Sequence, residues 1–93
     1  MKPGRELDEL VAKKVMGYKY KVLEYSTDIA AAWEVVEKMK DNGYEIIINV
    51  NTCEIKMTYW NDAGQAARGV KIFGDSIAMG ICLAVLKEFG VEV

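Results

Sequence analysis

The sequence predicts a single α+β domain in which helices pack on a three-stranded antiparallel sheet. Apolar residues recur at helical spacing near both ends of the chain, and apolar and polar residues alternate between Tyr44 and Phe73. A length of 93 residues is too short for two cores, so residues 1–93 are expected to form one domain. Apolar residues make up 52% of the chain and charged residues 28%, which excludes disorder and collagen-like chains.

The first helix is predicted over Arg5–Met16, because its apolar residues form one stripe while charged residues occupy the opposite face. Gly17 is expected to end this helix. Residues Tyr18–Tyr25 then alternate between aromatic or aliphatic side chains and lysines. This alternation is typical of an edge strand whose lysines discourage further pairing, so we expect an edge strand before the second helix.

The second helix is predicted between the N-cap candidates Ser26-Thr27-Asp28 and the exit at Asn42-Gly43. Alanines near its start are small enough to allow close helix packing. We expect its buried face to consist of Ile29, Trp33, Val36 and Met39. Trp33 is therefore expected in the core.

Three antiparallel strands are predicted over residues 44–50, 53–60 and 68–73, with a tight turn at Asn51-Thr52. A last helix begins at an N-cap, Asp75 or Ser76, and runs to Phe89. The order is thus helix, edge strand, helix, three antiparallel strands, helix. Ile47 and Trp60 lie opposite the dominant apolar face of the sheet, so two arrangements fit: an α-β-α sandwich, or a two-layer fold whose open face pairs with another subunit.

The last helix carries no charge from Ile77 to Leu86 and is apolar around its whole circumference. Such a helix must be surrounded, and a chain of this length offers few elements to surround it. We therefore expect self-association, most simply a twofold dimer, to cover part of it. The predicted interface residues are Ile77, Ile81, Leu83, Val85 and Leu86.

Charge and residue types exclude several function classes. A net charge of −2 argues against nucleic-acid binding, and the absence of histidine removes the usual proton shuttle and the commonest zinc ligand. The sequence therefore predicts no catalytic residue, no metal site and no cofactor. Glycines at 69 and 74 have the spacing of a phosphate-binding Walker A loop, but Asp75 replaces its lysine. The same acidic residue opens the last helix where double-stranded-RNA-binding domains place lysines.

Membrane and redox features point to the cytosol. The N-terminal residues lack the apolar core of a signal peptide, and the longest uncharged run, Ser76–Leu86, spans only about 16 Å as a helix. Cys53 and Cys82 are interpreted as two reduced, small apolar residues. We expect a cytoplasmic protein with no membrane contact.

Three segments carry a resemblance to a known family. They are residues 4–17 (GRELDELVAKKVMG), 25–38 (YSTDIAAAWEVVEK) and 81–87 (ICLAVLK). Over nearly the whole chain the sequence resembles the phage ABA sandwich domain family, small and mostly hypothetical proteins of phages and prophages. The resemblance implies an α-β-α sandwich and no assigned catalytic residue. Related sequences often read GDTAPEA where this chain has GDSIAMG at residues 74–80.

The leading functional hypothesis is a non-enzymatic phage or prophage accessory protein that self-associates and binds a host or phage protein. The predicted contact residues are Tyr18, Tyr20, Trp60 and Arg68, because aromatic residues and arginine favour interfaces. The alternative is a module that sequesters a small nucleotide-like anion. It would use helix-start amides near Ser26, Thr27 and Gly74, with Arg68 as counter-charge. A hydrolase is the third hypothesis.

Overall fold

The structure is a computed structural model that describes residues 2–18 and 21–91. The helices and strands of this part of the chain confirm the predicted α+β class and, with one exception, the predicted order. In chain order they are α1 (Arg5–Leu10), η1 (Val11–Met16), α2 (Ile29–Asp41), β1 (Tyr44–Asn49), β2 (Glu54–Trp60), β3 (Ala66–Phe73) and α3 (Ile77–Glu88). Helix η1 continues α1 with π-helical winding, and Gly17 ends it in the left-handed conformation, as expected.

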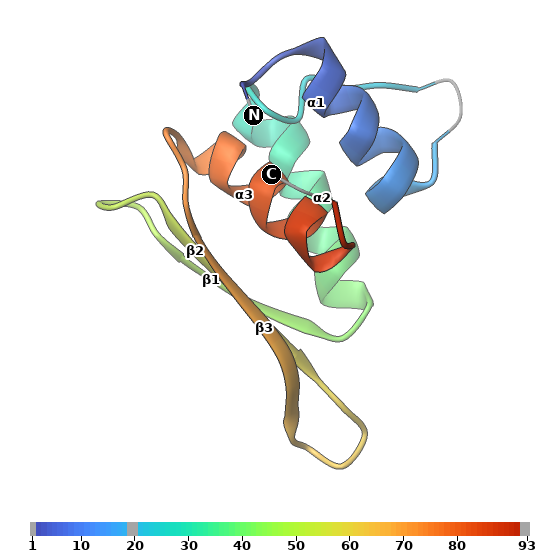
Figure 1. The fold of residues 1–93 in the computed structure, drawn as a ribbon, viewed down its shortest axis with the longest axis vertical. Coiled ribbons are helices and arrows are strands. Elements are labelled where there is room, and N and C mark those ends of the chain that lie inside the picture. Colours follow the sequence, from blue (N-terminus) through green and yellow to red (C-terminus); the bar gives the residue numbers. More distant parts are fainter. Residues whose placement is uncertain (1, 19–20, 92–93) are drawn as a thin grey trace.

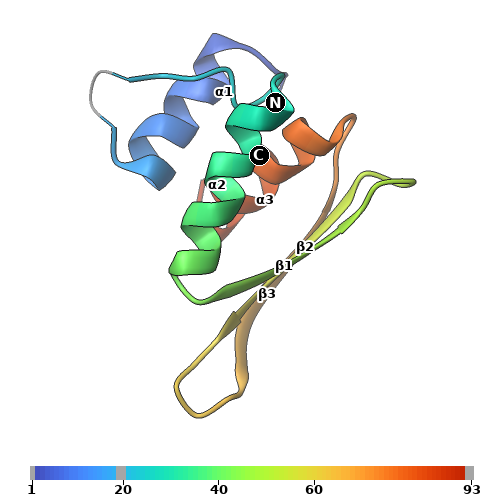
Figure 2. The same ribbon diagram turned by 180° about the vertical axis from the view of Figure 1, so that it is seen from behind.

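All helices lie on one side of the sheet. Figures 1 and 2 show α2 and α3 on one face of the sheet, and α1 with η1 on the far side of those two helices. The main tertiary contacts of the first helix are accordingly those of η1 with α3 and α2. Of the two arrangements predicted, this is the one with an open sheet face, because the apolar stripe of α1 and η1 covers α3 and leaves the sheet uncovered.

The sheet has the order β1-β2-β3 with both pairs antiparallel. Tyr44, Ile46 and Ile48 of β1 oppose Tyr59, Met57 and Ile55 of β2 and face the helices together with them. A loop over residues 50–53 joins these strands, so β1 and β2 are shorter than predicted at this end. Cys53 explains the later start of β2, because its φ of 57° is left-handed and interrupts extended backbone. At the end of β1, Oδ1 of Asn49 accepts a hydrogen bond from the backbone N–H of Asn51 at 3.0 Å, which favours a turn there.

The predicted edge strand over Tyr18–Tyr25 is absent from the described residues. Tyr18 and residues 21–24 form no strand; Tyr20 lies outside the described residues. Val22 and Leu23 are half-buried against the core, so the alternation reflects a segment that crosses the helices and not a strand. The segment ends in a turn in which Glu24 accepts hydrogen bonds from the backbone N–H groups of Thr27 and Asp28.

Helix α2 is rotated relative to the predicted orientation. Its buried residues are Ala31, Ala32, Val35, Val36 and Met39. Ile29 and Trp33 lie on the exposed side, and Trp33 is 49% exposed, so its predicted core position is wrong. The small side chains of Ala31 and Ala32 let the backbone of α2 come close to its neighbours, which favours the alanine face over the tryptophan face.

Helix α3 is enclosed within a single chain. It contacts α2 on one side, β2 and β3 on another, and η1 on a third. Ile81, Val85 and Leu86 are almost wholly buried, so these three predicted interface residues are not available to a second subunit. Ile77 and Leu83 are half-buried. Helices α2 and η1 and strands β2 and β3 supply the cover that was expected from a dimer partner.

A glycine contact holds the start of α3 against the sheet. Gly74 lies between β3 and α3, and a Cβ built on it would be 2.5 Å from the backbone N and Cα of Gly80. Only hydrogen atoms fit between these two backbones. Ser76, the actual N-cap of α3, accepts a hydrogen bond from the backbone N–H of Met79 at 3.1 Å.

Replacement of Gly74 by alanine is expected to lower the free energy of unfolding by about 2–3 kcal/mol, because the added methyl group meets backbone that cannot rotate away. Urea denaturation measures the change. Gly69→Ala is the matched control, since a Cβ there has no neighbour closer than 3.5 Å. Its stability should be unchanged or higher by up to about 1 kcal/mol. Equal losses in both variants would contradict the proposed close contact.

Candidate functional site

The face of the sheet that points away from the helices exposes several large apolar side chains. Three large apolar side chains on it are exposed: Ile47 at 52%, Trp60 at 43% and Phe73 at 60%. Strand alternation places them among polar neighbours on this outer face. The outer face consists of Glu45, Ile47, Asn49, Glu54, Lys56, Thr58, Trp60, Ala66, Gly69, Lys71 and Phe73.

A shallow hollow of about 490 Å³ lies at one end of the outer face. Trp60, Lys56 and Glu45 line it together with Thr58 and residues 66–69 of β3. The small residues of β3 make room here, because Gly69 has no side chain and Ala66 and Ala67 have only methyl groups. The strand pairing between β2 and β3 shifts at Tyr59 and Trp60, and such an irregularity re-aims the side chains beside it.

Some charged residues of the outer face form ion pairs within the chain, and others do not. Lys71 pairs with Glu54 at 3.5 Å and its Nζ lies 5.7 Å above the ring of Phe73. Neither Lys56 nor Glu45 has an ion-pair partner within the described residues. The hollow therefore offers an aromatic surface, one positive group and one negative group to a binding partner.

Arg68 has a different role from the one predicted. Its Nε lies 2.9 Å from Oε1 of Glu88, whose side chain is only 6% exposed. The guanidinium lies 5.1 Å from the ring centre of Tyr59 and donates to the hydroxyl of Tyr44 at 3.2 Å. That hydroxyl donates to Glu88 at 2.8 Å. Burial, followed by this hydrogen bond to Glu88, raises the pKa of Tyr44, so the phenol stays protonated as the donor. Arg68 thus connects the sheet to the end of α3.

The residues predicted for anion binding are not brought together. Arg68 is bound to Glu88 in the last turn of α3, whereas Gly74 precedes the first turn of this 12-residue helix, about 18 Å away. Ser26 is buried, and its Oγ accepts from the backbone N–H of Gly4 at 2.9 Å. Thr27 is exposed, and the N-cap of α2 is Asp28, which accepts from Ala30 N–H at 2.9 Å.

Tyr18 lies on the helical side of the molecule and not on the outer face of the sheet. It is half-buried against the core, and Nζ of Lys21 lies 5.4 Å from its ring centre. Of the predicted contact residues, Trp60 therefore remains on the open surface with a side chain free to meet a partner. The described residues do not bring Tyr18 and Trp60 onto one surface.

A buried polar cluster fixes the N-terminal segment and was not predicted. Asp8, expected on the solvent side of the first helix, is only 4% exposed and accepts a hydrogen bond from Ser26 N–H at 2.8 Å. Nearby in the sequence, Tyr25 is fully buried and its hydroxyl has no hydrogen-bond partner among the described residues. Burial raises the pKa of Tyr25. Nothing in the helical periodicity distinguishes Asp8 from its exposed neighbours.

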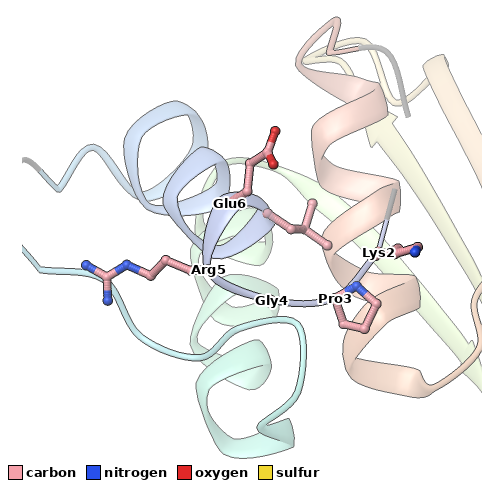
Figure 3. A pocket seen from close by; sticks show the side chains of 6 residues that line it. Lys2, Pro3, Gly4, Arg5 and Glu6 are labelled. Atoms are coloured by element: carbon pink, nitrogen blue, oxygen red, sulfur yellow. The ribbon is translucent and has the colours of Figure 1, made fainter.

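The surface around residues 2–7 contains a second hollow, of about 340 Å³. Figure 3 shows the polar side chains of Lys2, Arg5 and Glu6 pointing in different directions from the segment that leads into α1. Arg5 instead pairs with Glu9 at 2.9 Å along the exposed helix. Polar groups that diverge in this way do not form a binding site.

The described residues contain no group of three or more acidic, cysteine or histidine side chains that could hold a metal ion. Both cysteines are free thiols. Burial, with a smaller contribution from Asp8, raises the pKa of Cys82 to about 12, which keeps this thiol protonated and unreactive. No helix in the described part of the chain has the length and apolar character needed to cross a membrane.

The fold and the outer face define a small α+β domain with helices on one side of the sheet and an accessible surface on the other. Residues 9–86 match the phage ABA sandwich domain family. This match covers most of the chain, so the protein belongs to that family, as the resemblance implied. Comparison with curated proteins found no match, and comparison with solved structures found none.

Asp8→Ala is expected to destabilise the protein, whereas Tyr25→Phe is not. Removal of the Asp8 carboxylate leaves the buried N–H of Ser26 without its acceptor and should cost about 1–3 kcal/mol. Removal of the Tyr25 hydroxyl eliminates a buried polar atom that has no partner, so Tyr25→Phe should leave the free energy of unfolding unchanged or raise it. Chemical denaturation tests both, and a large loss in Tyr25→Phe would show a hydroxyl contact.

Stability is expected to fall in alkali through Cys82. The folded state keeps its proton up to about pH 12, whereas the unfolded thiol titrates near its ordinary pKa of 9.0. The stabilisation from this group is therefore complete below pH 9 and is lost as the pH rises toward 12. The stability difference between the wild type and Cys82→Ala should narrow over this window in denaturation experiments. A constant difference would contradict the raised pKa.

Proposed function

We propose that this chain is a non-enzymatic binding module of a phage or prophage, which self-associates and contacts a protein partner through the outer face of its sheet. The observation that carries the proposal is the exposure of Ile47, Trp60 and Phe73 on a face that no element of the described chain covers. A solvated sheet face normally carries polar residues, so large apolar side chains here favour a contact surface.

The hollow beside Trp60 supports this assignment. Tryptophan is enriched among the residues that contribute most to protein interfaces, because it buries a large apolar area and still offers one hydrogen-bond donor. Lys56 and Glu45 at the rim of the same hollow are free to pair with charges of a partner. The partner is expected to be a host or phage protein that inserts an apolar side chain next to Trp60, in the cytoplasm of the infected cell.

A non-enzymatic role is part of the proposal. The buried thiol of Cys82 is held in its protonated form, and the Arg68–Glu88–Tyr44 group is used to join the sheet to α3. Both features give stability and offer no activated nucleophile or base. Sequestration of a small anion, the alternative, would have to use Trp60 and Lys56 in the hollow, since Arg68 and Gly74 lie at opposite ends of α3.

Trp60→Ala is expected to weaken partner binding about thirtyfold or more, the loss typical of a tryptophan at the centre of an interface. Tagged variants expressed during phage infection, with quantitative mass spectrometry of the co-purified proteins and titration of the purified partner, measure the effect. Trp33→Ala is the matched control, because Trp33 is similarly exposed but lies on α2. Equal retention of partners by both variants would contradict the proposed surface.

A thermal-shift screen with nucleotides separates the two functions. Stabilisation of the wild type by a planar anion, lost in both Trp60→Ala and Lys56→Ala, would favour sequestration, since a ligand that binds only the folded state raises its stability. No shift with any nucleotide is the result expected for the protein-binding module.

A further inference from the structure

We infer that two copies of this chain pair antiparallel along strand β1, forming one continuous six-stranded sheet with a twofold axis at Ile47. This inference rests on the self-association in the proposed function and names the surface that forms it. β1 and β3 are the two edges of the sheet, and no strand of the described residues lies beyond either. Three observations indicate that the strand added to the β1 edge is β1 of a second copy of this chain.

The first observation is that β1 has unpaired backbone groups in a regular row. Trp60 N–H donates to Gly43 C=O at 3.4 Å, in register with the pairing of Tyr44 and Tyr59. Hydrogen-bonded positions alternate along an antiparallel pair, so the next groups directed at β2 belong to Glu45, Ile47 and Asn49. The N–H and C=O groups of Tyr44, Ile46 and Ile48 therefore point outward from the sheet.

The second observation is that β1 lacks most of the features that protect edge strands from pairing, and Glu45 is its one charged residue. Its residues, YEIIIN, include no lysine, arginine or proline, and its pairing with β2 has no bulge. The other edge differs. β3 carries Arg68 and Lys71, and its pairing with β2 is irregular at Tyr59 and Trp60. The β1 edge is thus the one open to strand addition.

The third observation is that β1 is self-complementary. Residues 44–50 read YEIIINV, which is symmetric in polarity about Ile47: apolar, polar, three isoleucines, polar, apolar. An antiparallel twofold at Ile47 places Ile46 opposite Ile48 of the second copy and Glu45 opposite its Asn49. A twofold axis at Glu45 would instead place the carboxylates of Glu45 from the two copies opposite each other. A register displaced by one residue would turn the inward side chains to the outer face.

Pairing at this register satisfies backbone groups of β1 that have no partner in a single chain, and it covers side chains that a single chain leaves partly exposed. The pair formed by Ile46 and Ile48 of the second copy exchanges both backbone hydrogen bonds, and so does its symmetry mate. Ile46 and Ile48 are half-buried and would gain apolar neighbours on the inner face. Ile47, which is 52% exposed, would contact Ile47 of the second copy on the outer face. The two outer faces would then form one surface with two hollows.

The test uses Ile47→Lys and Ile47→Glu, substitutions at an exposed position that leave the monomer core untouched. Analytical ultracentrifugation over a dilution series should show a wild-type dimer, and each variant alone should dissociate about tenfold or more readily, since like charges would oppose each other across the axis. An equimolar mixture of the two variants should dimerise again. Phe73→Lys, a matched change on the same face at the β3 edge, should dimerise like the wild type.

Amide hydrogen exchange by NMR provides a second readout. In the dimer the amides of Tyr44, Ile46 and Ile48 should exchange slowly, and in Ile47→Lys they should exchange fast. The amides of Glu45 and Ile47 are bonded to β2 and should be protected in both. A dimer that survives Ile47→Lys, or that leaves Ile46 and Ile48 unprotected, overturns the β1 pairing alone.

A monomer at every concentration overturns the pairing and the self-association in the proposed function. Partner binding through Trp60 is measured separately in the co-purification experiment and does not depend on that outcome.

Discussion

The enclosure of α3 is the constraint on which the rest of the structure depends. A helix without charges from Ile77 to Leu86 must be covered on every side, and this chain covers it with α2, the sheet and η1. The first helix is needed for that cover, so it cannot also pack on the other face of the sheet. The open outer face, with Trp60 and its hollow, is therefore a direct consequence of a helix that is apolar all round.

Much of this fold follows from local pattern. The strands in residues 44–73, the end of α2 at Asn42-Gly43 and the end of η1 at Gly17 depend on backbone geometry within a few residues. The structure has the helix ends where they were predicted and the strand ends within about two residues of their predicted positions. The side on which the first helix packs depends instead on whether it buries more apolar area against α3 or against the outer face of the sheet. The periodicity of the sequence does not indicate which of the two is preferred. The rotation of α2 was missed for a related reason. Alanine and tryptophan stripes have the same period, and the choice between them is made by how closely α3 approaches.

In the candidate site, too, local pattern predicts some features and tertiary contacts decide the others. Trp60 and Ile47 were predictable as outward residues because strand alternation assigns faces directly. The role of Arg68 was not, since its partners Glu88 and Tyr44 come from distant parts of the chain and meet only in the folded state. Ser26 was likewise assigned to a helix start and Asp8 to a solvent face. Both are buried, and the backbone N–H of Ser26 donates a hydrogen bond to Asp8. Contacts between residues far apart in sequence are the ones that a single sequence does not reveal.

The position of the first helix has a consequence for the order in which the molecule matures on the ribosome. Residues 5–16 are synthesised before α2 and α3, but their main contacts are with these two helices, and α3 is completed only at residue 88. The first helix can therefore complete its packing only after α3 has been synthesised and has left the exit tunnel. Until then the nascent domain presents an uncovered apolar layer, and a nascent-chain chaperone would find its binding surface there.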